Sequence, residues 1–296
     1  MSSRLIDGIL GIKPLANFAK SRARKMMVER AEKIGVPWRK TVDELRSLDW
    51  ERRRDRLQDP TLTYPDYYLT SFHAYEEGNM SWDAAFEQEC AACAVHAKVW
   101  PEAGKDGDRR LRQSYQDVLR QQLPREPQRI LDLGCGVGMS TFALQELYPE
   151  AKVTGVDLSP YFLSVAEYNS EKSDRSVTWK HAPAEATGFR DRSFDLVSAC
   201  SLFHEVPLIP TRAIFAEALR LLSPGGYFAL MDTNPRSQAF AKMPGYVFTL
   251  FKSTEPYLDD YFSLDLEDAL QTAGFEKPSL TCNSPRHRAI IAKKPD

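Results

Sequence analysis

The chain has 296 residues, of which 43% are apolar and 27% are charged, and its formal net charge at pH 7 is -2. These proportions are those of an ordinary globular protein, argue against nucleic-acid binding over the whole surface, and allow one sizeable domain with an accessory one. No apolar run approaches the roughly 20 residues that cross a bilayer, residues 1–13 lack the pattern of a secretory signal, and five scattered cysteines are typical of reduced thiols. We therefore expect a cytoplasmic protein without a disulfide framework.

Residues 1–40 differ in charge from the rest of the chain, because they hold ten Lys or Arg and three acids, a balance of +7. Apolar residues recur there at helical spacing and predict a helix over residues 4–34 that is interrupted near Pro14. Such a basic amphipathic arm suits weak, reversible attachment to an anionic membrane, so that the protein would be peripheral to it. The alternative is a helix that packs on the protein and keeps a solvated basic face.

The following segment predicts a strongly charged helix over residues 41–57, which ends before Pro60. Residues 64–82 are then dense in Tyr, Phe and Trp and include a single histidine, His73. Such side chains can roof a ligand pocket, because they combine apolar area with a hydrogen-bonding tip. We expect this aromatic segment on the acceptor side of a site, although packing in a helical core would use the same residues.

Ser81 is a favourable N-cap for a helix that runs to about Val99. Cys90, Cys93 and His96 lie on this helix at a spacing that invites comparison with zinc sites. A single Cys-x-x-Cys pair in an alanine-rich helix does not readily complete four ligands. We therefore predict no metal site and assign these residues to helix packing.

One more amphipathic helix is predicted over residues 111–123, and it ends at a linker that contains Pro124 and Pro127. We place a domain boundary at this linker. Residues 1–125 would then form a helical cap, and residues 126–296 would form the main domain.

Residues 128–142 read Gln-Arg-Ile-Leu-Asp-Leu-Gly-Cys-Gly-Val-Gly-Met-Ser-Thr-Phe. An apolar run followed at once by a glycine cluster predicts a strand, a tight turn and a helix. Gly134, Gly136 and Gly138 let the backbone turn sharply and approach a ligand without an intervening side chain. Such a glycine loop serves nucleotide sites of several kinds, and by itself it does not discriminate among them.

The next predicted strand, residues 152–156, is followed by Asp157, at the place where a doubly wound fold binds the hydroxyls of an adenosine ribose. The glycine loop that follows Asp132, taken with this acid, resembles the class I S-adenosylmethionine-dependent methyltransferases. The resemblance is to the group that methylates ubiquinone, menaquinone and natural products. A nicotinamide-dependent dehydrogenase or another Rossmann domain is the alternative that these two motifs leave open.

Later motifs favour the methyltransferase. Residues 182–197 resemble the family's loop beside the adenine, with Ser-Phe-Asp leading into a fourth strand over residues 194–200. Leu-Ser-Pro-Gly-Gly at residues 222–226 precedes the fifth strand and is a turn that dehydrogenases do not share. One departure is Pro183, which stands where many relatives have an Asp that binds the adenine amino group.

The resemblance implies an α/β fold with a doubly wound, mostly parallel sheet of seven strands whose last strand is antiparallel, and S-adenosylmethionine as the cofactor. Residues 233–263 would form an aromatic insertion above the carboxyl ends of the strands, where ligands bind in such sheets. By resemblance, the residues that line the cofactor are Asp132, Gly134, Cys135, Gly136, Gly138, Asp157, Leu158, Ala184, Glu185 and Ser201.

The segment after the fourth strand faces the methyl group in relatives, so His204 and Glu205, together with His73, are the predicted catalytic residues. A base is needed only if the acceptor atom must lose a proton. We expect O- or C-methylation of a small, largely apolar or aromatic molecule, because both segments that should cover the site are aromatic, and we expect no nucleic-acid partner for that reaction. The alternatives are a protein or RNA methyltransferase and a non-catalytic, cofactor-binding scaffold at a membrane surface.

Overall fold

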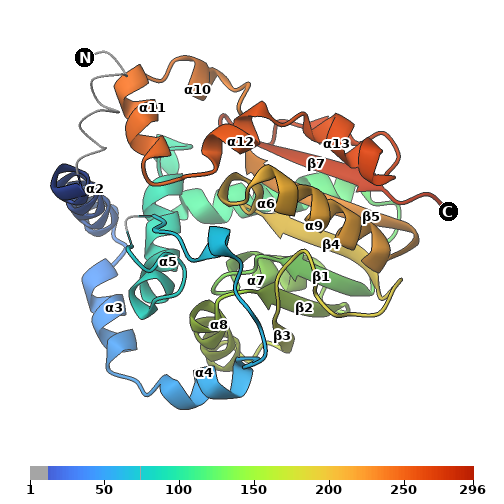
Figure 1. Ribbon diagram of the computed structural model, residues 1–296, viewed down its shortest axis with the longest axis horizontal. Helices are drawn as coiled ribbons and strands as arrows, with labels where there is room; N and C mark the ends of the chain where they lie inside the picture. The colour runs from blue at the N-terminus through green and yellow to red at the C-terminus, as the bar shows by residue number, and fades with distance from the viewer. Residues whose placement is uncertain (1–12, 74) are drawn as a thin grey trace.

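The computed structural model describes residues 13–73 and 75–296. Within these residues, seven strands form one sheet in the order β3-β2-β1-β4-β5-β7-β6, and β7 is antiparallel to both of its neighbours (Figure 1). The predicted doubly wound sheet with an antiparallel last strand is therefore confirmed. The strands are β1 (Arg129–Leu133), β2 (Lys152–Asp157), β3 (Val177–His181), β4 (Phe194–Cys200), β5 (Leu222–Thr233), β6 (Ser279–Thr281) and β7 (His287–Lys293).

The central strands pair through side chains that are buried. Ile130 of β1 is in register with Val153 of β2 on one side and with Leu196 of β4 on the other. All three side chains are buried, as expected of parallel strands that helices cover on both faces. The carboxyl ends of β1, β2 and β4 therefore meet at one edge, and the loops that leave this edge carry most of the predicted site residues.

Helices cover both faces of the sheet (Figure 1). The covering helices are α6 (Gly107–Gln122), α7 (Met139–Leu147), α8 (Pro160–Lys172), α9 (Leu208–Leu221) and α13 (Leu266–Ala273). Phe215 of α9 and Leu270 of α13 share one apolar cluster with the strands, while Tyr115 of α6 and Leu144 of α7 share the other. Because α6 packs on the sheet although it precedes residue 125, the division into a cap and a main domain stays a prediction.

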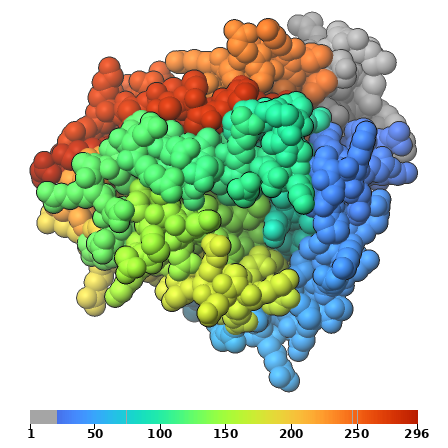
Figure 2. Space-filling view, turned by 180° about the vertical axis from the view of Figure 1, so that it is seen from behind, coloured from blue at the N-terminus to red at the C-terminus, as the bar shows by residue number. Residues whose placement is uncertain are grey.

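Helices that precede α6 pack beside the sheet, and Figure 2 shows the first of them in blue along one flank of the molecule. They are α2 (Lys13–Lys33), α3 (Trp38–Arg46), α4 (Glu51–Leu57) and α5 (Trp82–His96), with short 3-10 turns η1 (Asp66–Tyr68) and η2 (Pro101–Asp106). Trp50 joins this layer to the domain, because its ring centroid lies 5.3 Å from that of Phe86 in α5 and 5.4 Å from that of Tyr168 in α8. Val28 and Ala31 of α2 are buried in the same cluster.

The charged helix predicted over residues 41–57 is wrong as a single element, because the chain leaves helical geometry between α3 and α4. Ser47 Oγ donates to the carbonyl of Glu44 at 2.7 Å, and Trp50 Nε1 donates to the carbonyl of Leu45 at 2.6 Å. These bonds satisfy carbonyl groups at the end of α3 that have no partner within the helix. The break also brings the Trp50 ring into the apolar cluster, a tertiary gain that outweighs local helix propensity.

Two other predictions concern helix α2 and the start of helix α5. Pro14 stands in the first turn of α2, where its missing N–H costs no hydrogen bond, and the helix is unbroken from Lys13 to Lys33. The predicted interruption near Pro14 is therefore not seen in the described part of this helix. Residues 4–12 of the predicted N-terminal helix lie outside the described residues. The predicted N-cap is confirmed, since Ser81 Oγ accepts from the backbone N–H of Ala84 at 3.2 Å. In the part of the chain that the structure describes, no helix combines the length and the apolar character of a membrane span.

The predicted insertion, residues 233–263, contains three helices among the described residues: α10 (Gln238–Ala241), α11 (Gly245–Lys252) and α12 (Leu258–Ser263). Helix α12 packs on η3 (Phe203–Glu205), the turn that follows β4. Tyr257 of the insertion donates its hydroxyl to the carbonyl of Tyr67 at 3.0 Å, which links the insertion to the aromatic segment.

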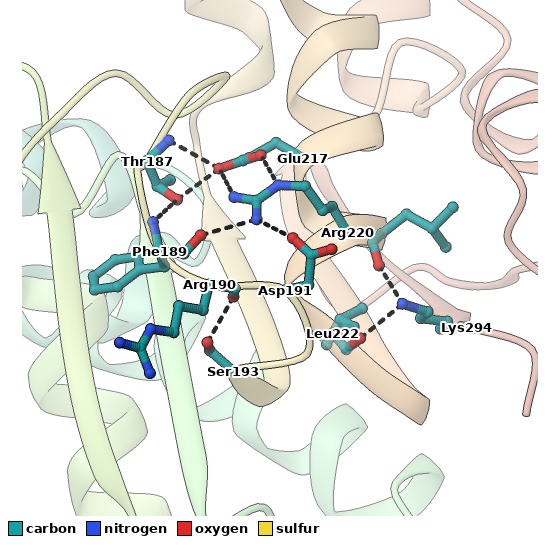
Figure 3. Close-up of polar contacts among 10 residues, drawn as sticks. Thr187, Phe189, Arg190, Asp191, Ser193, Glu217, Arg220, Leu222 and Lys294 are labelled. Atoms are coloured by element: carbon teal, nitrogen blue, oxygen red, sulfur yellow. Dashed lines mark hydrogen bonds and ion pairs between the residues drawn. The ribbon is translucent and has the colours of Figure 1, made fainter.

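The loop between β3 and β4 is fixed to α9 by one carboxylate (Figure 3). Glu217 Oε1 accepts from the backbone N–H of Thr187 at 2.9 Å and from its hydroxyl at 2.6 Å, and both Glu217 oxygens accept from Arg220 at 2.8 Å. Arg220 in turn donates to the carbonyl of Phe189 at 2.8 Å. This network therefore positions the loop that carries the predicted adenine-binding residues.

We predict that Glu217→Ala lowers the free energy of unfolding by about 3 kcal/mol, because it removes charge-assisted hydrogen bonds and leaves the buried N–H of Thr187 without a partner. Urea denaturation measures this change. Asp191→Ala is the matched control, since Asp191 pairs with the same Arg220 but its side chain is 72% exposed, against 7% for Glu217. The control should cost less than about 1 kcal/mol. Equal losses in the two variants would contradict the proposed role of Glu217.

The contribution of Glu217 to the free energy of unfolding should also depend on pH. Burial opposes charge on this carboxyl, but the hydrogen bonds from Arg220 and Thr187 outweigh burial and lower its pKa below the ordinary 4.5. A carboxyl whose pKa is lowered by folding stabilises the protein above its unfolded pKa, and this stabilisation is lost as the pH falls through the folded value. The difference between wild type and Glu217→Ala should therefore be constant above about pH 5 and shrink in stronger acid.

Candidate active site

The glycine loop between β1 and α7 adopts backbone geometry that other residues rarely take. Gly134 and Gly136 have φ angles of 65° and 53°. A Cβ atom at Gly136 would collide with the side chain of Gln88, and one at Gly134 would collide with that of Leu202. The left-handed turns therefore favour glycine at both positions, and both glycines line a cavity.

Asp157, at the end of β2, fastens this loop. Its Oδ2 accepts from the backbone N–H of Gly136 at 2.8 Å, and its Oδ1 accepts from the N–H of Ser159 at 2.8 Å and from the hydroxyl of Tyr68 at 3.4 Å. Burial raises the pKa of this carboxyl, while the same hydrogen bonds oppose that rise. The acid therefore lies beside the glycine loop, where a ribose would be bound.

Eight of the ten predicted cofactor residues line one cavity of about 440 Å³. These residues are Gly134, Cys135, Gly136, Asp157, Leu158, Ala184, Glu185 and Ser201. Asp132 and Gly138 are not among the lining residues. Asp132 is fully buried and its Oδ2 accepts from the hydroxyls of Ser140 and Thr141 at 2.6 and 2.7 Å, while Gly138 is the N-cap of α7. Both residues hold the start of α7 behind the loop.

The aromatic segment lies nearer the cofactor side than the sequence predicted. Tyr68 contacts Asp157, and Tyr67 donates its hydroxyl to Glu185 Oε1 at 2.8 Å, so two tyrosines bond the two acids assigned to ribose and adenine. Glu185 Oε2 is buried and has no hydrogen-bond partner. Only the later part of the segment, with His73, reaches the other end of the cavity.

The three predicted catalytic residues lie together at that end, which we call the acceptor end. His73 Nε2 lies 3.4 Å from Glu205 Oε1, and His204 Nε2 lies 3.9 Å from the same oxygen. Two acids that the sequence analysis missed complete the cluster. His204 Nδ1 bonds Asp232 Oδ1 at 2.7 Å, and His73 Nε2 lies 2.8 Å from Glu255 Oε1. The structure thus brings together side chains from the aromatic segment, the β4 and β5 ends and the insertion.

Electrostatics at the acceptor end favour charged imidazoles. Loss of hydration opposes charge on both rings, less so on His73, whose side chain is 39% exposed, than on buried His204. The neighbouring carboxylates outweigh this effect and raise the pKa of His73 to about 9 and that of His204 to about 10. Burial raises the pKa of Glu205. Asp232 directly follows an apolar stretch of β5, which is a signal that could have found it, whereas nothing in the local sequence distinguishes Glu255.

Arg112 of α6 is a further cation in the cavity wall, and sequence reasoning missed it. Its Nε donates to Asp108 Oδ2 at 2.8 Å, and Asp108 Oδ1 lies 2.7 Å from His96 Nδ1. The Arg112 side chain is 18% exposed and Met139 of the adjoining helix contacts it, so it could bind a ligand carboxylate near the glycine loop. In the sequence, an arginine on an amphipathic helix cannot be distinguished from one on the solvent-exposed face. This is why the sequence analysis did not predict that Arg112 lines the cavity.

Cys90, Cys93 and His96 of α5 have separate surroundings. Burial raises the pKa of both thiols to about 12, and His96 pairs instead with Asp108. Cys90 packs in the apolar cluster of α2, α3 and α5. These contacts agree with the helix-packing role that the sequence predicted for them.

The sheet order, the glycine loop after β1 and the acid after β2 together define the class I, S-adenosylmethionine-dependent methyltransferase fold. Residues 130–226 match a protein family described as "Methyltransferase domain". Residues 130–226 therefore form a methyltransferase domain, and the fold around them is that of enzymes that use S-adenosylmethionine.

Known proteins that resemble the chain carry the same domain. An uncharacterized methyltransferase of Synechocystis is 33% identical over 148 residues, which are 50% of this chain and 66% of the relative. A ubiquinone biosynthesis O-methyltransferase of Nitrosococcus oceani is 31% identical over 158 residues, 52% of this chain and 65% of the relative. The chain thus spans slightly less than two thirds of the length of these relatives.

Among solved structures, a phosphoethanolamine N-methyltransferase of Haemonchus contortus in complex with phosphomonomethylethanolamine and S-adenosylhomocysteine has the same fold. The TM-score is 0.55 at 16% sequence identity, and the match covers 74% of this chain and 60% of that chain.

We predict that Asp157→Ala weakens S-adenosylmethionine binding by roughly 100-fold or more, because two charge-assisted hydrogen bonds to the ribose, each worth about 1.5 to 3 kcal/mol, are lost. Isothermal calorimetry with S-adenosylmethionine and its demethylated product measures the affinity. Tyr68→Phe is the control: it removes only the hydroxyl 3.4 Å from Asp157 and should change affinity a few-fold at most. Unchanged binding in folded Asp157→Ala, or a preference for NAD, would refute the assignment.

Proposed function

We propose that this chain transfers the methyl group of S-adenosylmethionine to an oxygen or carbon atom of a small, largely apolar or aromatic molecule. The observation that carries the proposal is a cavity of about 440 Å³ that runs from the glycine loop to the acceptor end. Its volume lies in the range of roughly 300 to 1,000 Å³ that is typical of small-molecule sites. The similarity to a ubiquinone biosynthesis O-methyltransferase supports the same class of acceptor.

The cover of the cavity supports a small acceptor over a polymer. Phe72 from the aromatic segment and Phe251 from the insertion both line the cavity. The two covering segments are bonded to each other, because His73 N–H donates to the carbonyl of Thr254 at 3.0 Å and Tyr257 donates to Tyr67. A protein or RNA chain would need an open trench in place of this joined cover.

The bound cofactor supplies a methyl group that is already strongly electrophilic, so the protein mainly aligns the acceptor with that methyl group and excludes water. His204 can assist, because its Nδ1 is held by buried Asp232 and its Nε2 lies at the cavity. Because the neighbouring carboxylates keep this imidazole charged at neutral pH, it can donate a hydrogen bond that orients an acceptor oxygen. Glu205 lies next to it and can orient the imidazole from the other side.

The test of the proposal is methyl transfer from labelled S-adenosylmethionine to a panel of phenols, quinols and related small molecules, with total RNA and total protein as competing acceptors. We expect label in small aromatic acceptors. Label confined to RNA or protein would favour the polymer alternative, and cofactor binding without transfer to any acceptor would favour the scaffold.

Once an acceptor is identified, His204→Ala should lower kcat by about 10²- to 10⁴-fold, because it removes the charged hydrogen-bond donor that orients the acceptor. The affinity for S-adenosylmethionine should stay within a few-fold of wild type, since none of the predicted cofactor contacts involves His204. Steady-state kinetics and calorimetry give the two numbers. Full activity in the variant would mean that His204 only packs, and His73 would then be the next candidate.

We also propose that residues 1–40 make a weak, reversible contact with anionic membranes. The apolar side of α2 is partly used in packing at Val28 and Ala31, so the contact would rest on basic side chains such as Arg22 and Lys25, which are exposed. Each basic side chain near such a surface contributes about 1 kcal/mol at low salt.

Reversing the charges of both Arg22 and Lys25 should therefore weaken co-sedimentation with anionic vesicles about tenfold or more. Neutral vesicles should bind neither the variant nor the wild type. Equal sedimentation of the variant and wild type would reject this contact.

A further inference from the structure

The acceptor end holds a set of side chains that the methyl-transfer proposal does not use fully. His73, Glu205 and Glu255 come from three segments far apart in the sequence, and their ligand atoms all lie within 4.8 Å of one another. Among the described residues, no other set of three or more His, Cys, Asp or Glu side chains brings its possible metal-ligand atoms this close together. His73 and Glu205 were both predicted as catalytic residues, but no motif in the sequence points to Glu255.

The separations between these atoms suit a common metal ion. His73 Nε2 lies 2.8 Å from Glu255 Oε1 and 3.4 Å from Glu205 Oε1. Nitrogen and oxygen donors that share one ion at about 2.0 to 2.2 Å lie about 3.0 to 3.5 Å from each other. The separation from His73 to Glu205 falls in this range, and the shorter one to Glu255 is that of a direct ion pair, which a bound ion would widen slightly. One imidazole and two carboxylates are also a donor set that divalent transition metals accept.

An unsatisfied carboxylate oxygen gives a second, independent indication of a missing ligand. Glu255 lines the cavity and is only 5% exposed, and its Oε2 is buried without a hydrogen-bond partner. Glu205 has only a long contact on its own second oxygen, from Asn79 Nδ2 at 3.4 Å. Buried carboxylate oxygens normally have a hydrogen-bond or metal partner, so a ligand of Glu255 Oε2 is expected here.

The charges that face the group leave room for such a cation. Glu205, Glu255 and Asp232 are the nearby acids, and His73 and His204 are the nearby bases. His204 is already engaged by Asp232 at 2.7 Å, which leaves His73 between two carboxylates. Three carboxyl groups therefore face two imidazoles at this place.

The backbone holds two of the three donors in position. His73 has a φ angle of 50°, in the left-handed region that a residue with a side chain seldom adopts. The backbone N–H of His73 donates to the carbonyl of Thr254, the residue before Glu255. The His73 ring packs edge-on against the Phe72 ring, with 4.5 Å between the ring centroids. The loop that carries the imidazole and the loop that carries the carboxylate are thus fixed to each other.

We propose that His73, Glu205 and Glu255 bind a divalent transition-metal ion at the acceptor end of the cavity. Three protein donors leave open coordination positions, as in catalytic zinc sites, and these positions would take oxygen atoms of the methyl acceptor. The ion would also bridge the aromatic segment, the turn after β4 and the insertion. Its role in acceptor binding rests on the proposed function, whereas its binding to the protein does not.

The test uses the full chain, freed of metal with a chelator and without cofactor or acceptor. Mn²⁺ is titrated in, and the loss of the free-ion signal in electron paramagnetic resonance gives the bound fraction. We expect one Mn²⁺ per chain, and competition by Zn²⁺ at the same site. Glu255→Gln and, separately, Glu205→Gln should each weaken Mn²⁺ binding about tenfold or more, because even second-shell partners of a metal change affinity by about 10- to 100-fold.

Glu185→Gln is the matched control, since Glu185 lines the same cavity and also has an unpartnered oxygen but does not belong to the group of three. It should bind Mn²⁺ as the wild type does. Thermal melting shows that each variant is folded, and either glutamate variant suffices for the comparison. No bound Mn²⁺ in the folded wild type, or equal weakening in Glu185→Gln, would overturn the proposal.

The same samples separate this inference from the proposed function. Calorimetric binding of S-adenosylmethionine without any binding of Mn²⁺ would reject the ion and leave methyl transfer in place. Bound Mn²⁺ that Glu255→Gln weakens, in a chain that transfers no methyl group, would support the ion and reject the proposed reaction.

Discussion

The buried carboxylate of Asp157 is the interaction on which the site depends. It accepts hydrogen bonds from Gly136 in the glycine loop, from Ser159 at the start of α8 and from Tyr68 in the aromatic segment. A buried charge is tolerated only when such donors replace water. Because these donors belong to three different segments, the same requirement that keeps the charge stable also fixes the loop, a helix and the cover around one point.

The cavity combines a regular framework with an irregular cover. Parallel strands and their helices fix the glycine loop and the acids that follow β1 and β2, whereas the cover comes from the aromatic segment and the insertion. The cover is held by a few bonds between loops, such as that from Tyr257 to the carbonyl of Tyr67. Contacts of this kind are lost more easily than the packing of a sheet, so the cover is the part that can open for ligands.

The acceptor end departs from the apolar character of the rest of the interior. Replacing buried ionic groups with apolar residues often stabilises a protein, so a concentration of acids and imidazoles such as Asp232, His204 and Glu255 is costly unless it serves a ligand or a reaction. The pKa values of His73 and His204 are raised to about 9 and 10 because the carboxylates outweigh the effect of burial. This part of the chain thus has the chemistry of a site in addition to that of a core.

The sequence by itself determined the sheet, the glycine loop and Asp157, because a strand, its turn and the following helix are specified by neighbouring residues over short stretches. It also found His73, His204 and Glu205 as candidates. Only the tertiary structure decided that Glu255 joins them and that Arg112 enters the cavity wall. It also decided the break that brings Trp50 into the core between α3 and α4. These features arise where side chains distant in sequence converge, and the local pattern of a helix or loop is the same whether or not such a partner is present.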